Sequence, residues 1–208
     1  MPPGETAWED VVHGRTAFEN RTIGDFIVLR SDGAPVYNLA VTVDDLDMRI
    51  THVVRGDDHI SNTPKQILIY RALGAEPPVF AHVPLILGSD KSKLSKRHGA
   101  IAVTAYREQG FLADAFVNFL ALLGWSPGSD RELFAKKDLI EAFDLAGISG
   151  GNAVFNPEKL DWFNQQHLMR LPPAELVVRL KPYFDAAGLW DATWVDERRA
   201  WFFAVLEL

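Results

Sequence analysis

The densest positive charge in the chain lies in residues 91–97. Four cations fall within these seven residues with no acid between them, Lys91, Lys93, Lys96 and Arg97. The apolar run 79–87 predicts a strand, and Gly88-Ser89-Asp90 predicts an exposed turn that leads into the cations. Lysine is a compact charge on a flexible stem, so such a loop can follow the oxygens of a polyphosphate. A solvated basic loop is an equally good interpretation of the spacing alone.

The remainder of the chain is acidic, which limits what these cations can bind. The 208 residues carry 28 Asp and Glu against 21 Lys and Arg, a formal net charge of −7. This balance argues against a protein that coats nucleic acid by charge alone, so any polyanion has to be bound locally. With 48% apolar residues, the chain can bury the core of one large or two small domains.

The composition also bears on the compartment and on cysteine chemistry. No apolar run approaches the roughly 18 residues of a membrane span, and Met1–Glu5 lacks the features of a signal peptide. We therefore expect a cytoplasmic protein that does not contact a membrane. The absence of cysteine excludes disulfides, thiolate catalysis and cysteine-ligated zinc or iron–sulfur sites.

Histidine and acidic residues do not predict a bound metal. The six histidines are scattered, with no pair at the spacing of two ligands on one helix. Asp44, Asp45 and Asp47 form a close acidic group, for which a solvated acidic turn is the preferred interpretation. Magnesium usually arrives with a nucleotide, held by the phosphates and few carboxylates. We expect no metal site built by the protein.

The elements before the lysine loop predict an α/β arrangement. Residues 26–30 and 36–41 flank Asp32-Gly33 and predict a hairpin. Residues 51–55 predict a further strand that is apolar enough to be buried on both faces. In an open α/β sheet, ligands collect at the carboxyl ends of strands, where both Arg55 and the lysine loop are expected.

Helices are predicted on either side of the lysine loop. Ser61-Asn62-Thr63-Pro64 has the composition of a helix start, and Gly74 is a typical helix end. From about residue 104 the apolar spacing is helical, with helices expected at 112–123, 137–143, 157–168 behind the cap Asn156, 173–186 and 194–206. Five tryptophans in this part are expected to be core residues rather than RNA-stacking platforms, Trp125, Trp162, Trp190, Trp194 and Trp201.

Several segments in the correct order carry a resemblance to a known family. Lys93-Leu94-Ser95-Lys96-Arg97 resembles the second signature motif of class I aminoacyl-tRNA synthetases, in the form used by glutamate enzymes. Other segments resemble bacterial glutamyl-tRNA synthetases, namely Leu29–Gly33, Tyr37-Asn38, Val43–Asp45, Val54–His59, Thr63-Pro64 and Phe155–Trp162. The resemblance covers essentially the whole chain.

The resemblance implies a fold that is α/β followed by all-α. It consists of the second half of a Rossmann-type catalytic domain, a helical stem-contact domain and the start of a helical anticodon-binding region. The implied boundaries are 1–24 for the end of an insertion that contacts the acceptor arm, 25–103, 104–171 and 172–208. The first family signature, of the His-Ile-Gly-His type, is absent. We therefore expect an internal fragment that is inactive in isolation.

The resemblance assigns Tyr37 and Arg55 to a glutamate pocket. A phenol can donate to a carboxylate, and the planar guanidinium fork suits a carboxylate better than lysine does. From the residues alone, Tyr37 is instead a core aromatic, and Arg55 pairs with Asp57 or Asp58. His59 falls where some family members place an aromatic residue near the substrates, and Val41 stands where some have a substrate-contacting asparagine.

The resemblance assigns the lysine loop to ATP. Lys96 matches the lysine that stabilises the transition state of adenylate formation, Lys93 assists it, and Ser95 belongs to the same motif. Leu85 and Ile86 match backbone positions that flank the adenine. From the sequence alone, their side chains are expected to be ordinary buried strand residues. The implied partners are ATP with its Mg²⁺, L-glutamate and tRNA(Glu), and the parent enzyme is expected to be a monomer without protein-bound zinc.

The implied reaction is that of a glutamate–tRNA ligase. Glutamate attacks the α-phosphate of ATP, and the glutamyl group then passes to the ribose at the 3′ end of the tRNA. Three alternatives remain open: a non-catalytic helical tRNA-binding module, an unrelated nucleotide-binding protein, and a shorter synthetase-like enzyme that modifies a tRNA base. The predicted helices after Pro172 count against the last of these.

Overall fold

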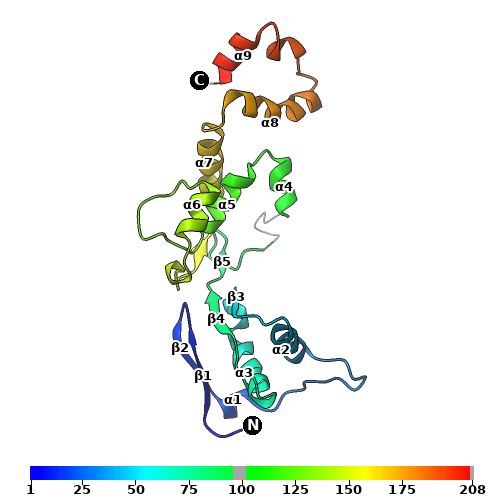
Figure 1. The fold of residues 1–208 in the computed structure, drawn as a ribbon, viewed down its shortest axis with the longest axis vertical. Helices are drawn as coiled ribbons and strands as arrows, with labels where there is room; N and C mark the ends of the chain where they lie inside the picture. Colours follow the sequence, from blue (N-terminus) through cyan, green and yellow to red (C-terminus); the bar gives the residue numbers. More distant parts are fainter. Residues whose placement is uncertain (96–101, 207–208) are drawn as a thin grey trace. The chain divides into compact units, whose positions relative to one another are not determined.

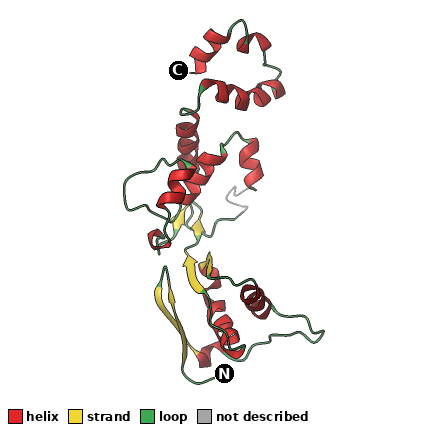
Figure 2. Cartoon of the chain, in the orientation of Figure 1, coloured by secondary structure: helices red, strands yellow, loops and turns green. Residues whose placement is uncertain are grey.

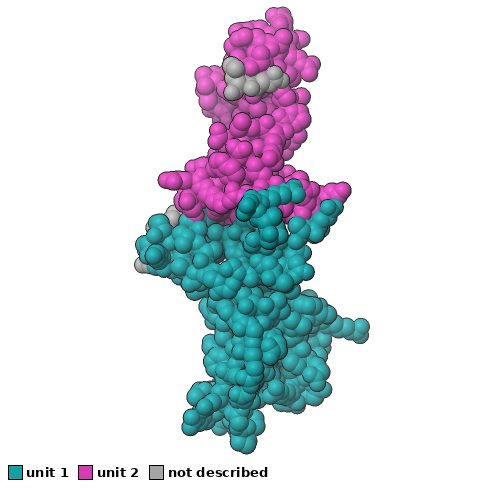
Figure 3. Space-filling view, turned by 90° about the vertical axis from the view of Figure 1, so that its left-hand side faces the viewer, with its two compact units in different colours: residues 1–100, 121–131, 140–155 teal, residues 101–120, 132–139, 156–208 magenta. Residues whose placement is uncertain are grey.

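The computed structural model describes residues 1–95 and 102–206, which fall into two compact units (Figure 3). The first unit comprises residues 1–100, 121–131 and 140–155, and the second comprises residues 101–120, 132–139 and 156–208. The predicted α/β segment lies in the first unit, and most of the predicted helices lie in the second.

A four-stranded sheet of order β2-β1-β4-β3 organises the first unit (Figure 1). Strands β1 (Glu5–Asp10) and β2 (Gly14–Glu19) form an antiparallel hairpin. Strands β3 (His52–Gly56) and β4 (Val79–Val83) pair in parallel, with Arg55 opposite His82. The hairpin joins β4 where Asp10 meets Phe80. The segment 1–24 therefore contributes two strands to the sheet that contains the strand carrying Arg55.

Helix α3 (Thr63–Ala72) follows β3 after the short helix η1 (Asp57–Asn62) and packs beside the sheet. Pro64 lies in its first turn, where its missing N–H costs no hydrogen bond, and Gly74 follows its end at φ 70°. The predicted helix is confirmed. Its buried residues include Ile67, Ile69 and Tyr70, so the core of this unit lies between α3 and the sheet.

The predicted hairpin at 26–41 is wrong. Residues 26–36 contain a single bridge, between Leu29 and Pro35, and helix α2 (Tyr37–Asp47) replaces the second strand after the short helix α1 (Asn20–Ile23). The Asp32-Gly33 turn does form, with Gly33 at φ 83°. The strand fails because α2 contacts α3, with Thr42 buried and Gln66 of α3 donating to the Asn38 side chain (3.2 Å), and these tertiary contacts override the β-branched composition.

The acidic group and the third strand also differ from expectation. Asp44, Asp45 and Asp47 lie on α2 and not in a turn. Strand β3 occupies the predicted position, but it is not buried on both faces, since Val54 is 48% exposed. The reason is its place at the edge of the four-stranded sheet, where only β4 pairs with it.

The predicted strand at 79–87 forms two strands, because Pro84 interrupts it. Strand β5 (Ile86–Leu87) leaves the main sheet and pairs in parallel with β6 (Ala153–Val154), so the lysine loop begins from this small second sheet. Nearby, the Trp125 indole donates to the Asp144 carbonyl (2.9 Å) and packs against Gly147 in helix η3 (Leu145–Gly147), where a Cβ would lie 2.5 Å from the indole nitrogen.

Helices make up the regular structure of the second unit (Figure 2). Helices α7 and α8 have the predicted bounds, and the Asn156 side chain caps α7 by accepting from the Lys159 amide (3.1 Å). The predicted helix 194–206 is interrupted, and forms η4 and α9. The helices are α4 (Val103–Glu108), α5 (Ala113–Ala121), α6 (Lys136–Ala142), α7 (Pro157–Leu168), α8 (Pro173–Ala186), η4 (Ala192–Val195) and α9 (Arg199–Leu206).

The tryptophans divide between core and surface. Trp125 is buried as predicted, whereas Trp162 and Trp201 are 37% and 50% exposed. The prediction is wrong for these two because the adjacent Phe163 and Phe202 take the buried faces of α7 and α9 instead. Arg198 lies 4.5 Å from the centre of the Trp201 ring, and Trp162 meets Phe163 edge to face.

Asn118 on α5 connects three segments of the second unit. Its fully buried side chain accepts from the Phe134 amide (2.8 Å) and donates to the Glu132 carbonyl (2.9 Å). Its oxygen also lies 3.0 Å from Nε2 of His167 on α7. The amide thus satisfies backbone groups that the surrounding apolar side chains cannot.

We expect Asn118→Ala to destabilise the chain by about 2–3 kcal/mol, because it leaves buried donors and acceptors without partners. Urea unfolding followed by circular dichroism measures the effect. Val117→Ala, at an exposed position on the same helix, is the matched control and should change stability by less than about 1 kcal/mol. Equal losses for the two variants would contradict this role of Asn118.

Candidate functional site

The candidate site is centred on Arg55, near the carboxyl end of β3. The parallel register places Arg55 opposite His82 of β4, and Arg55 Nε donates to His82 Nε2 (3.1 Å). Arg55 Nη2 donates to Oγ1 of Thr63, the first residue of α3 (2.7 Å). The guanidinium also lies 5.4 Å from the centre of the Phe80 ring. Two strands and one helix therefore hold this side chain.

His82 is completely buried and links Arg55 to a buried carboxylate. Its Nδ1 lies 2.5 Å from Oδ2 of Asp10, and the side chains of the two residues are 0% and 1% exposed. The other carboxylate oxygen of Asp10 accepts from the amides of His82 (3.1 Å) and Val12 (3.1 Å), and the Trp8 indole donates to Oδ2 (3.2 Å). The carboxylate is thus fixed where the β1–β2 hairpin meets β4.

Burial sets the protonation states of this group. Burial alone raises the pKa of Asp10, but hydrogen bonds from His82, Trp8 and Val12 outweigh it, so the pKa lies below its usual value. Burial lowers the pKa of His82 despite the nearby Asp10. Burial also lowers the pKa of Arg55, which the neighbouring Tyr37, Asp45 and Asp10 oppose. Aspartate, neutral imidazole and guanidinium follow one another in this chain of hydrogen bonds.

Tyr37 and His59 lie on the solvent side of Arg55. Tyr37 is 48% exposed, which rules out the core-aromatic interpretation, and its phenol lies close enough to Arg55 to affect the pKa of the guanidinium. Its hydroxyl is 3.4 Å from Nδ1 of His59, whose ring is half-buried and centred 5.9 Å from the Tyr37 ring. The structure therefore brings together Tyr37, Arg55 and His59, the three residues assigned to a substrate pocket.

The predicted ion pair of Arg55 with Asp57 or Asp58 is wrong. Asp57 pairs with Nε2 of His13 (2.8 Å), and Asp58 pairs with the Lys93 ammonium (2.8 Å). Both acids lie on η1, where each carboxylate has another partner in place of Arg55. The Lys93 pair lowers the pKa of Asp58 and ties the lysine loop to the end of β3.

The described part of the lysine loop is a tight turn. The Gly88 amide donates to the Ser92 carbonyl (2.9 Å), the Leu94 amide donates to the Ile86 carbonyl (2.8 Å), and Lys91 has φ 61°. Lys93 and Ser95 are exposed, and Leu85 is half-buried. The expectation of a buried side chain is wrong for Ile86, which is 37% exposed. Lys96 and Arg97 lie outside the described residues.

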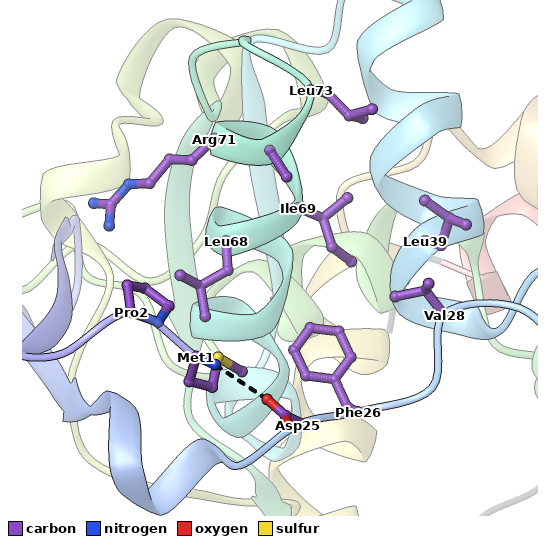
Figure 4. A pocket seen from close by; sticks show the side chains of 11 residues that line it. Met1, Pro2, Asp25, Phe26, Val28, Leu39, Leu68, Ile69, Arg71 and Leu73 are labelled. Carbon is purple, nitrogen blue, oxygen red and sulfur yellow. Dashed lines mark hydrogen bonds and ion pairs between the residues drawn. The ribbon is translucent and has the colours of Figure 1, made fainter.

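A separate cavity of about 840 Å³ lies between α2, α3 and the first residues of the chain (Figure 4). Its lining is largely apolar and includes Phe26, Val28, Leu39, Leu68 and Ile69. The terminal amine pairs with Asp25 at its rim (3.1 Å). Of the predicted site residues that the structure describes, none lines this cavity, so its chemistry is distinct from that of Arg55.

The structure offers no group of three or more histidine, aspartate or glutamate ligands for a metal ion within residues 1–95 and 102–206. In the same ranges, no helix is long and apolar enough to cross a membrane. The residues that sequence reasoning missed are Asp10, His82 and Thr63. The sequence signal available for His82 is that it is a lone polar residue inside an apolar strand. Asp10 lies 72 residues away in the sequence, and nothing in its surroundings marks it as the partner of His82.

A family model described as the catalytic domain of class I tRNA synthetases (E and Q) matches residues 2–162. The chain belongs to this family. It is 55% identical over 188 residues to glutamate–tRNA ligase 1 of Acidithiobacillus ferrooxidans and 51% identical over 197 residues to glutamate–tRNA ligase of Dechloromonas aromatica. These alignments cover 90% and 95% of the chain but only 40% and 42% of the relatives.

A solved structure supports the same relationship. The chain resembles the crystal structure of a glutamate tRNA ligase from Elizabethkingia meningosepticum in complex with its amino acid, with 32% identity and a TM-score of 0.86. The match covers 95% of this chain and 42% of that protein. The chain therefore spans about 40% of the length of the glutamate–tRNA ligases that it resembles. The family resemblance seen in the sequence is confirmed.

The buried pair predicts how stability depends on pH. His82 has a folded-state pKa below 6.5, so below that pH the unfolded chain takes up a proton that the folded chain does not. The free energy of unfolding should fall as pH decreases from 7 to 5, by up to about 1.4 kcal/mol per pH unit for this one group. The depressed pKa of Asp10 extends the loss below pH 4.

Urea unfolding at several pH values tests this expectation. His82→Gln removes one titrating group, so its stability should depend less on pH between 7 and 5 than that of the wild type. His52→Gln, at an exposed histidine on β3, should keep the wild-type dependence. Parallel curves for the wild type and His82→Gln would show that His82 is not held neutral.

Proposed function

We propose that the chain is part of a glutamate–tRNA ligase. In the whole enzyme, glutamate attacks the α-phosphate of ATP to form glutamyl-adenylate and pyrophosphate, and the glutamyl group then passes to the 3′ end of tRNA(Glu). The single observation that carries the proposal is the position of Arg55, a half-buried cation near a strand end that donates to the neutral groups His82 and Thr63. A carboxylate substrate supplies the missing negative charge.

Tyr37 and His59 complete the proposed glutamate site. The Tyr37 hydroxyl lies next to the Arg55 side chain and can donate to the same carboxylate. His59 limits the pocket on the other side of the Tyr37 ring. The guanidinium fork then binds a carboxylate in preference to a neutral amide, because only the carboxylate compensates its charge.

ATP is bound at the lysine loop, which follows the end of β5. We assign its phosphates to Lys93, Ser95 and Lys96, and its adenine to the backbone of Leu85 and Ile86. No protein nucleophile is required, since the reaction depends on positioning and on stabilising charge at the phosphate oxygens. Mg²⁺ accompanies the nucleotide and is held mainly by its phosphates. The Lys93 ammonium is available once it exchanges the exposed Asp58 carboxylate for a phosphate.

The rest of the architecture follows from the family. Residues 25–103 form the second half of a Rossmann-type catalytic domain, preceded by the end of an acceptor-arm insertion at 1–24. Residues 104–171 contact the tRNA stem, and residues 172–208 begin the anticodon-binding region. The free edge of β3 offers a place for a strand of the first half of the catalytic domain. We propose a cytoplasmic, monomeric parent enzyme.

The 208-residue chain by itself should form no glutamyl-adenylate at a useful rate. It contains no His-Ile-Gly-His motif to grip the ATP phosphates from the first half of the sheet. Loss of a single preorganised donor costs about 3–4 kcal/mol of transition-state stabilisation. Glutamate-dependent ATP–pyrophosphate exchange by the purified chain should therefore stay at background, and robust exchange would overturn this part of the proposal.

Supplying the first half of a glutamate–tRNA ligase catalytic domain as a second polypeptide should raise the exchange rate. In that complex, Arg55→Lys should raise KM for glutamate about tenfold or more and leave KM for ATP nearly unchanged, because lysine lacks the planar fork. Lys96→Ala should instead lower kcat. Arg49→Lys, at an exposed arginine, is the control.

The same preparation distinguishes the proposal from a helical tRNA-binding module. The module predicts tRNA binding that survives deletion of residues 1–100 and does not respond to Lys96→Ala. Glutamate-dependent exchange that responds to Arg55→Lys is incompatible with a purely binding role.

A further inference from the structure

The hydrogen-bond partners of Arg55 are unusual for a half-buried cation. The guanidinium is half-buried, yet within the described residues no carboxylate forms an ion pair with it. A cation withdrawn from water normally needs a paired charge, because desolvation is costly. Here the direct acceptors are an imidazole nitrogen and a hydroxyl oxygen. The side chain is therefore held in place without being neutralised.

The hydrogen bonds determine the tautomer of His82. An arginine Nε–H can only donate, so His82 Nε2 is the acceptor and carries no proton. The ring proton is then on Nδ1, and it is donated to the Asp10 carboxylate at 2.5 Å. The Thr63 hydroxyl, 3.0 Å from the same Nε2, is also bonded to Arg55. Asp10 thus fixes the form of His82 that can accept from Arg55.

Asp10 itself has little freedom to move. Besides the ring and the amide of His82, the amides of Val12 and His13 and the Trp8 indole donate to its carboxylate. These donors come from the β1–β2 hairpin and from β4, so the sheet pairing sets the carboxylate position. The imidazole ring then stands between the carboxylate and the guanidinium. The negative charge of Asp10 orients Arg55 through His82 but does not reach it as an ion pair.

We propose that Asp10 and His82 are positioning residues for a carboxylate-selective Arg55. Neutral His82 anchors Nε of the guanidinium and the Thr63 hydroxyl accepts from Nη2, so no negative charge is spent on Arg55 and its remaining N–H groups stay available to the substrate. An arginine paired directly with an acid would accept a neutral amide almost as well as a carboxylate. The Asp10–His82 pair thus favours an acidic over an amide side chain. This inference rests on the proposed function, since it specifies how the glutamate site gains its selectivity.

Two substitutions at position 82 separate a positioning role from a general structural one. In His82→Asn, the amide can still donate to Asp10 from near the Nδ1 position, but no acceptor remains for Arg55. In His82→Gln, the longer side chain places an acceptor near the Nε2 position. Both residues are neutral and polar. Asp10→Asn removes the group that fixes the tautomer, and His52→Gln is the control on the same strand as Arg55.

The experiment uses the 208-residue chain labelled with ¹⁵N. Imidazole and guanidinium NMR signals report the His82 tautomer and the Arg55 Nε–H, and titrations with L-glutamate and L-glutamine at constant ionic strength report binding. We expect protonated Nδ1, bare Nε2, and at least about tenfold tighter binding of glutamate than of glutamine. His82→Asn should lose about tenfold in glutamate affinity, and His82→Gln less than threefold. Circular dichroism verifies that each variant is folded.

The outcomes distinguish this inference from the proposed function. A His82 ring protonated on Nε2, or equal glutamate affinities for folded His82→Asn and His82→Gln, would overturn the positioning role even if glutamate binds. Wild-type chain with the expected tautomer but without a preference for glutamate over glutamine would contradict the proposed glutamate site itself, and with it the selectivity. Asp10→Asn should resemble His82→Asn in glutamate affinity, and wild-type affinity in that variant would remove Asp10 from the inference.

Discussion

The hydrogen bond from Arg55 Nε to His82 Nε2 is the interaction on which the site depends. It joins two parallel strands at the residues that their register places opposite each other. Thr63 at the start of α3 and Asp10 at the end of β1 are bonded to the same pair, so the hairpin, the sheet and the helix meet at one buried cluster. A polar cluster of this kind is stable only because its members satisfy one another.

The carboxylates around this cluster are of two kinds. Asp10 is buried and is joined to Arg55 through the neutral ring of His82. Asp57 and Asp58 lie nearer the surface, pair with His13 and Lys93, and leave Arg55 without a direct counter-ion. Exposed pairs contribute little to stability and exchange readily with solvent or ligands. In the proposed function, this arrangement leaves Arg55 for a carboxylate and Lys93 for phosphates.

Local signals predicted the elements that depend on local chemistry. Helices α7 and α8 have the expected bounds, because Asn156 caps the first and proline occupies the first turn of both. The lysine motif likewise depends on contiguous residues, and the family model confirms the relationship that it indicated. The predicted strand at 36–41 is wrong because its β-branched composition favours a strand, whereas contacts with α3 hold residues 37–47 as a helix.

The amino-acid sequence by itself determined the family, most helices, and the positions of β3 and α3, and it singled out Tyr37 and Arg55 as candidate site residues. Only the tertiary structure decided what holds Arg55. Asp10 and His82 are separated by 72 residues, and their 2.5 Å contact exists because β1 and β4 lie side by side in one sheet. Sequence spacing contains no information about such a contact, since strand order and register bring the two side chains together only after the sheet has formed.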